Sequence, residues 1–133
     1  MLSEPMRIAY LVVAVVAAGM AAFSALGKLR HDPKIVHVIH EIVGVPLNYF
    51  PHLAACEIAG ALGLILGIWL PRVGMAAGIG LVVYFVGAIV SHLRVGDWKG
   101  IGPAAFMLII SFTALVLSLV AILAQLPKLI PNP

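Results

Sequence analysis

Three ionisable residues of this chain, Lys28, Glu57 and His92, lie inside or at the margin of long apolar runs. A carboxylate beside a lysine or a histidine forms an ion pair or relays a proton, and at membrane depth such groups normally pair. Ser24 precedes Lys28 by one helical turn, and Tyr84 precedes His92 by two. Each therefore shares a helical face with its neighbour and extends the polar lining inward. These residue types predict a polar site, but they name no reaction.

Other candidate chemistry is less specific. Arg94 lies beside His92 and joins the candidate polar site. The histidines and carboxylate of His37-x-x-His40-Glu41 resemble a metal trio, but an amphipathic helix at a membrane surface needs polar residues there anyway, so we expect no structural metal. The single cysteine, Cys56, excludes an intrachain disulfide, a C-x-x-C redox pair and C-x-x-C-H haem attachment, so no haem is expected. A quinone or a lipid remains open as a cofactor.

The composition identifies the environment in which such a site would work. The chain has 133 residues, 63% of them hydrophobic and 10% charged, against about 45–50% and about 25% in soluble domains. A single domain of this size cannot hide that much apolar surface from water, so lipid must cover it. Its eight Lys and Arg residues are scattered, and no nucleic-acid partner is expected.

Four apolar runs are each long enough to span a bilayer, at about residues 7–29, 52–70, 73–93 and 103–126. Residues 34–44 are too short to span, and their polar positions share one face, which predicts an amphipathic helix lying in the interface. Its apolar face should include Ile35, Ile39 and Ile42. Asn48–Pro51 supplies an aromatic interface anchor. Pro103 suits the first turn of the last span, after a polar loop over residues 94–102.

Short connections between four spans predict an all-α, up-down-up-down bundle in one transmembrane domain, residues 1–133. All five histidines fall at the end that holds residues 28–52 and 92–100. Glu57 lies about a turn and a half inside the second span, so it should face the bundle and pair with Lys28 or His92. Three alternatives stay open: Lys28 snorkels to the headgroups, His92 has no partner, or the cluster is a structural clasp.

Glycines are concentrated in the middle two spans, in Gly63-x-x-x-Gly67 and Gly74-x-x-x-Gly78. Such small-residue seams let helix backbones approach closely. Packing within the chain is the favoured explanation, and a homodimer seam is the alternative.

Several short motifs occur in a recognisable order. They are FSALGK at residues 23–28, EIAGALGL at 57–64, VGA at 86–88 leading to His92 and Arg94, and Pro103-Ala104. From about residue 8 to residue 120 the chain resembles the DoxX-like family of small four-span membrane proteins. The resemblance implies that Lys28, Glu57 and His92 match the family's recurring polar positions. It carries over no established catalytic residue.

The family takes its name from a subunit of a thiosulfate:quinone oxidoreductase, and other relatives belong to membrane-associated redox complexes or are animal membrane chaperones. The resemblance thus favours an accessory subunit, without independent activity, that docks a partner protein or a small amphiphile at its polar end. The alternative is a quinone-linked oxidoreductase component in which Glu57 and His92 relay protons for a redox partner protein. A transporter fits less well, because four short unbroken spans leave little room for alternating access.

The orientation follows from the basic residues. Five lie at the polar end and three at the other. Short cytoplasmic loops carry more Lys and Arg, so we expect the polar end to face the cytoplasm, in a bacterial-type cell membrane.

Overall fold

The structure, a computed structural model, describes residues 3–133 and confirms an all-α, four-span membrane bundle. Its four long helices are α1 (Glu4–Leu29), α3 (Phe50–Leu66), α4 (Pro71–Arg94) and α5 (Trp98–Gln125). Each is long and apolar enough to cross a membrane. The short elements are α2 (Pro33–Ile35), a π-helix η1 (Val36–Ile42) and the 3₁₀ turns η2 (Leu47–Tyr49) and η3 (Leu126–Lys128). The chain is therefore a multi-pass membrane protein.

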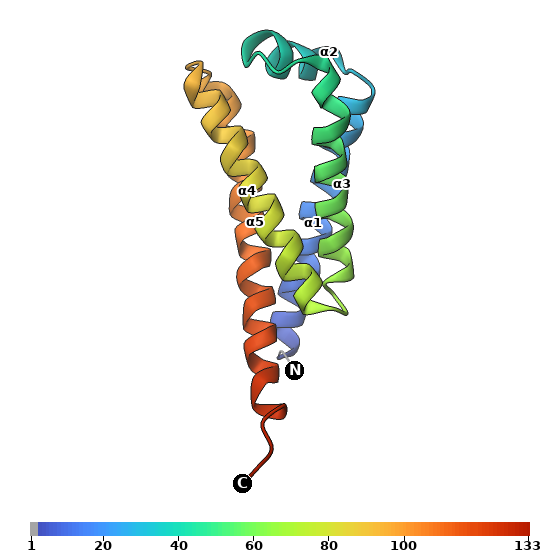
Figure 1. Cartoon of the computed structure of the whole chain (residues 1–133), viewed down its shortest axis with the longest axis vertical. Helices are drawn as coiled ribbons and strands as arrows, with labels where there is room; N and C mark the ends of the chain where they lie inside the picture. Colours follow the sequence, from blue (N-terminus) through green and yellow to red (C-terminus); the bar gives the residue numbers. More distant parts are fainter. Residues whose placement is uncertain (1–2) are drawn as a thin grey trace.

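The long helices form two antiparallel pairs, α1 with α3 and α4 with α5 (Figure 1). Both chain ends and the α3–α4 turn lie at one end of the bundle, which we call the terminal end. The segment that contains α2 and η1 crosses the opposite end, which we call the polar end. The two pairs are close at the terminal end and diverge toward the polar end (Figure 1).

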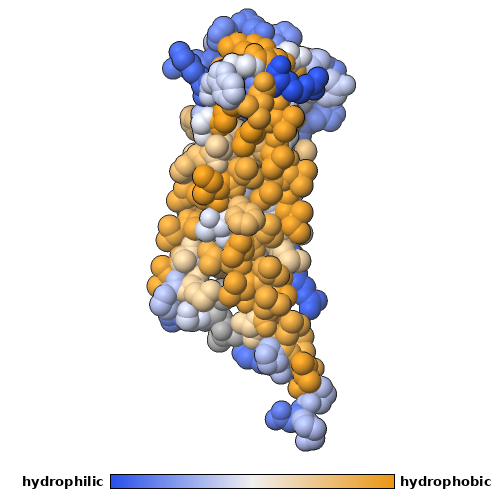
Figure 2. Space-filling model, turned by 90° about the vertical axis from the view of Figure 1, so that its left-hand side faces the viewer, coloured by the Kyte–Doolittle hydropathy of each residue, from blue (hydrophilic) through white to orange (hydrophobic). Residues whose placement is uncertain are grey.

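Small residues fill the interior and large apolar residues face outward, the arrangement expected where lipid rather than water surrounds the helices. In α1 the buried positions include Ala14, Ala17, Ala21 and Ala25. In α5 they include Ser111, Ala114, Ser118 and Ala121. Large side chains such as those of Phe23, Val83 and Ile109 are exposed, and an almost continuous apolar band covers the face in Figure 2. Sequence analysis overlooked these two small-residue stripes, although their spacing of three and four residues is visible in the chain.

Glycines allow the helices to pack closely toward the terminal end. A Cβ added at Gly67 would lie 2.5 Å from the Cα of Gly74, and one added at Gly78 would lie 3.0 Å from the Cβ of Leu115. A Cβ at Gly63 would meet that of Ala77 at 2.5 Å. The predicted seams therefore serve packing within the chain, where α3, α4 and α5 touch almost backbone to backbone.

The polar end begins where α1 stops. His31 has a left-handed backbone, with φ 50°, and Asp32 then accepts a 2.9 Å hydrogen bond from the Lys34 backbone N–H at the start of α2. The helix predicted over residues 34–44 is present, but residues 36–42 have π rather than α hydrogen bonding. Over only two turns, an amphipathic sequence pattern does not distinguish an α-helix from a π-helix. The side chain of Ile35 packs over Gly27, whereas Ile42 stays exposed and available to lipid.

The predicted start of the last span, at the polar end, is wrong. The last span begins at Trp98, not Pro103, because the Asp97 carboxylate accepts a 3.3 Å hydrogen bond from the Gly100 backbone N–H and starts the helix earlier. Pro103 lies inside α5. Within the aromatic segment predicted as an anchor, Tyr49 is 52% exposed, whereas Phe50 is fully buried, with its ring edge-on to His31 at 5.7 Å between centroids.

Candidate functional site

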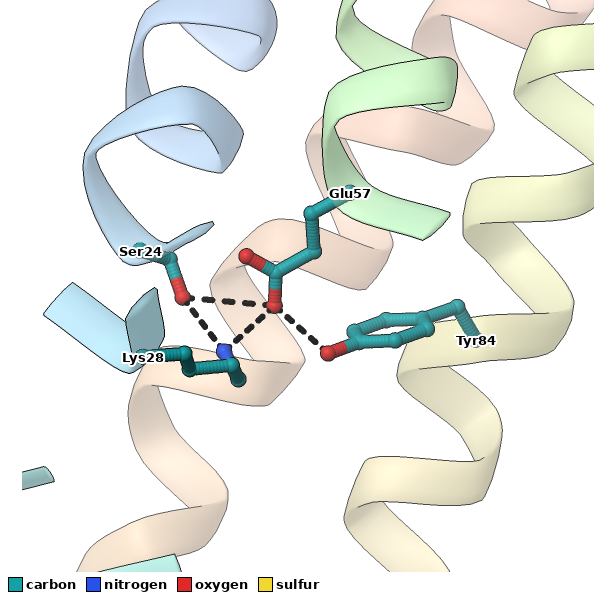
Figure 3. Close-up of polar contacts among 4 residues, drawn as sticks. All are labelled: Ser24, Lys28, Glu57 and Tyr84. Atoms are coloured by element: carbon teal, nitrogen blue, oxygen red, sulfur yellow. Dashed lines mark hydrogen bonds and ion pairs between the residues drawn. The ribbon is translucent and has the colours of Figure 1, made fainter. Parts of the chain in front are cut away.

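The centre of the candidate site is one oxygen of Glu57. Its Oε1 accepts hydrogen bonds from Lys28 Nζ at 2.5 Å, from the Tyr84 hydroxyl at 2.6 Å and from the Ser24 hydroxyl at 3.3 Å. Lys28 also donates to Ser24 Oγ at 2.8 Å. Figure 3 shows Ser24 and Lys28 reaching the carboxylate from α1 and Tyr84 reaching it from α4. We call these four residues the Glu57 cluster.

The two charged members are buried. The Glu57 side chain is 1% exposed and the Lys28 side chain 5%. Lys28 thus does not snorkel to the headgroups but turns inward to the carboxylate. Removing either partner would leave an uncompensated charge in a low-dielectric interior, so the two groups depend on each other. Ser24 lies one turn before Lys28, and this i, i+4 spacing on α1 brings both donors to the same side of Glu57.

The second carboxylate oxygen of Glu57 lacks the hydrogen bonds that the first one has. Glu57 Oε2 is buried and has no hydrogen-bond partner among residues 3–133. All three donors converge on Oε1, and in Figure 3 no dashed line reaches Oε2. A buried, unpaired acceptor costs about 1–3 kcal/mol, and more when it is charged. The cluster therefore has an acceptor that its own donors do not satisfy, a feature that residue spacing alone did not reveal.

The cluster lies well inside the bundle. Glu57 is seven residues beyond Phe50, the first residue of α3, which corresponds to about 10 Å along the axis. Tyr84 links the two helix pairs through a hydrogen bond, because its hydroxyl on α4 donates to Glu57 on α3. Beyond Tyr84 the last buried residue of α4 is Phe85, although the helix continues to Arg94. No residue of α4 beyond Phe85 is fully buried, which agrees with the divergence of the pairs in Figure 1.

Two predicted site residues lie outside the cluster. His92 Nδ1 lies 2.9 Å from Asp97 Oδ2, and both side chains are 12% exposed. This contact ties the end of α4 to the start of α5, and Asp97, five residues downstream, takes the partner role that we had considered for Glu57. Arg94 is exposed at the end of α4. Within residues 3–133 no direct hydrogen bond joins His92 to Glu57.

The remaining polar residues of this end are nearer the surface. His37 Nδ1 lies 2.6 Å from Glu41 Oε2, and both side chains are mostly exposed. His40 Nδ1 contacts the Val45 carbonyl oxygen at 2.8 Å. In the part of the chain that the structure describes, no three His, Cys, Asp or Glu side chains are grouped as a metal would need. The sole cysteine, Cys56, is exposed on α3.

Comparison with known proteins gives one match. The sequence model of the DoxX-like family matches residues 12–124, which include all four members of the Glu57 cluster. No curated protein and no solved structure matches the chain.

Proposed function

The chain belongs to the DoxX-like family of membrane proteins, and from that premise we propose that it is an accessory membrane subunit whose Glu57 cluster binds the headgroup of a small, uncharged amphiphile. The observation that carries this proposal is the unpaired, buried Oε2 of Glu57. A carboxylate that served only as a clasp would be expected to share its donors between both oxygens. Here one oxygen takes every donor, and the other has no partner among residues 3–133.

The chemistry of the cluster favours an uncharged headgroup. Lys28 and Glu57 balance each other, so a charged ligand would bring an uncompensated ion into the bundle. The Lys28 ammonium has three donors and uses two, on Ser24 and Glu57. A hydroxyl group can donate to Glu57 Oε2 and accept from the third N–H of Lys28. An alcohol or phenol headgroup could therefore bond to both the unpaired acceptor, Glu57 Oε2, and the unused N–H donor of Lys28.

The arrangement of the helices suggests where such a ligand enters. The pairs α1–α3 and α4–α5 diverge toward the polar end (Figure 1), and the last turns of α4 beyond Phe85 are not buried. An amphiphile entering from this end, with its tail in the lipid, meets Tyr84 and then the carboxylate. The proposal thus assigns Tyr84 to the entrance and Glu57 with Lys28 to headgroup binding.

The test is the identity of what the protein retains. Wild-type protein purified in mild detergent would be analysed by native mass spectrometry and by extraction of bound lipids. We expect a retained neutral, hydroxyl-bearing amphiphile, lost in Glu57→Gln and kept in Glu41→Gln, a matched change of an exposed carboxylate. Retention by Glu57→Gln, or a high-resolution map with one ordered water on Oε2 and no ligand, would overturn the proposal. Quinone-dependent turnover by the purified chain would instead support the oxidoreductase alternative.

We also propose that the polar end faces the cytoplasm. Because Lys28 is buried in the ion pair, four basic residues rather than five remain near the surface at this end, against three at the terminal end. The difference in the number of basic residues is small, but the polar end still has more of them, as the cytoplasmic side of a membrane protein usually does. Cysteines introduced at Asp97 and Asn132, in a Cys56→Ser background, should react with an impermeant reagent from the cytoplasmic and outer sides respectively. Labelling of position 132 from the cytoplasm alone would reverse the orientation.

A further inference from the structure

A second region at the opposite end of the bundle has the features of a binding site. A shallow groove of about 590 Å³ lies between the α3–α4 turn and the C-terminal end of α5. Figure 1 places both segments at the terminal end, away from the Glu57 cluster. Its floor is partly apolar and its polar lining comes from Arg72, Gln125 and Lys128.

The charges of the groove are one-sided. Arg72 and Lys128 line it, and no acidic residue does. Within residues 3–133 neither cation takes part in a salt bridge, whereas the nearby Arg7 is paired with Glu4 at 3.1 Å. Two uncompensated positive charges facing one groove attract an anion. A guanidinium matches a phosphate in a bidentate arrangement, and an ammonium adds a point charge beside it.

The apolar parts of the groove indicate that the anion belongs to a lipid. Trp69 and Leu129 line it and are 70% and 66% exposed. Trp69 follows the end of α3, where aromatic side chains commonly lie at the level of headgroups. A phosphate attached to acyl chains would contact the cations and cover these side chains at once. A free phosphate would leave them bare.

We infer that the groove is a binding site for the headgroup of an anionic phospholipid, held by Arg72 and Lys128. Gln125 lies in the same groove and is placed to bond the glycerol or hydroxyl part of the headgroup. The inference is independent of the proposed amphiphile site, which lies at the other end of the bundle and uses a charge-balanced pair.

Competition between lipids tests it. Protein in nanodiscs of phosphatidylcholine with a minor fraction of phosphatidylglycerol would be released into native mass spectrometry, and the bound lipids counted. The wild type should enrich phosphatidylglycerol. The Arg72→Gln/Lys128→Gln variant should lose about thirtyfold in relative affinity, since each basic residue near an anionic surface is worth about a factor of five or six. Arg30→Gln/Lys34→Gln is the matched control, because it removes one Arg and one Lys, both exposed, from the polar end.

The outcomes are distinct. Enrichment kept by the control and lost by the groove variant supports the site. Equal loss of phosphatidylglycerol enrichment in both variants would mean a general effect of net charge. No loss in either variant would mean that the lipid binds elsewhere. Each of these results would overturn the proposed site. Thermal stabilisation by inorganic phosphate that matches the effect of a short-chain phosphatidylglycerol would also overturn it, because the groove would then bind a free anion rather than a lipid.

Discussion

The polar and terminal ends of this bundle meet the constraint of the bilayer in different ways. At the polar end two charges are buried and joined across α1 and α3, and a single tyrosine links them to α4. At the terminal end the interior holds glycine, with Gly67 against Gly74, and charged side chains such as those of Glu4 and Arg7 lie outside, more than half exposed. The polar end is held by a buried ion pair, whereas the terminal end is held by close backbone contact and one buried hydrogen bond, from the Tyr10 hydroxyl to the Leu64 carbonyl oxygen at 2.8 Å.

This difference shows why the candidate site is at the polar end. Glycine contacts are short-ranged and rigid, so the helix interfaces inside the terminal end have little freedom to rearrange around a buried ligand. Hydrogen bonds to a carboxylate are directional but replaceable, because a ligand can take over a donor or an acceptor. The end with exchangeable polar contacts is also the end where the helix pairs diverge (Figure 1). Each of the following predictions tests one side of this contrast.

The largest effect is expected from breaking the buried pair. Lys28→Met or Glu57→Leu alone should lower the free energy of unfolding by about 3–5 kcal/mol, because each leaves an uncompensated buried charge. The double variant removes both charges and should recover most of the loss. Equilibrium unfolding in mixed micelles measures all three. A double variant as unstable as the sum of the single ones would show that the two side chains are not coupled.

The link between the helix pairs should come next. Tyr84→Phe removes only the hydroxyl that donates to Glu57, at a cost of about 1.5–3 kcal/mol for a hydrogen bond to a charged group. It should also widen the polar end, which pulsed electron paramagnetic resonance would detect between labels at residues 31 and 95. A pair of labels at residues 5 and 124 is the control, because the glycine contacts should hold the terminal end unchanged.

The glycine contacts should respond to a single methyl group. Gly67→Ala would place its Cβ 2.5 Å from the Cα of Gly74, so α3 and α4 must separate, at about 1–3 kcal/mol. Gly80→Ala on α4 is the control, since no atom lies within 4 Å of its added Cβ, and the lower backbone entropy of alanine should make it neutral or slightly stabilising. Equal thermal shifts in both variants would argue against close packing at this end.

Much of this architecture was predictable from the sequence. Apolar runs longer than the bilayer core predicted the four spans, and the cost of burying a carboxylate in lipid predicted that Glu57 pairs with Lys28 or His92, of which the structure shows Lys28. Helical spacing placed Ser24 beside Lys28 and Tyr84 on the face of His92, and the structure shows that Tyr84 donates to Glu57. Each of these inferences depends on the local chain and on one strong energetic penalty, so one sequence was enough.

Other features depend on how the helices are placed in space. The direction of Glu57 Oε2 and the divergence of the pairs follow from helix tilt, which residue spacing does not specify. The sequence predicts His92 at about the same membrane level as Lys28, yet in the structure His92 contacts Asp97 at 2.9 Å. The same Asp97 starts α5 before Pro103, a capping effect that the proline signal concealed. Local polar contacts thus overrode the longer-range pairing and the proline rule.

The smallest effect should come from the exposed ion pair of the terminal end. Arg7 and Glu4 are 3.1 Å apart, but their side chains are 55% and 75% exposed. Water screens such a pair and the side chains lose entropy in forming it, so Arg7→Gln should cost about 0–1 kcal/mol, and less in high salt. Lys28→Met removes a cation from a similar contact in a buried setting, so the ratio of the two costs measures what burial adds. If Arg7→Gln destabilised the protein as much as Lys28→Met, the ion pairs of the two ends would be equivalent, and burial would not explain why the Glu57 cluster holds its helices together.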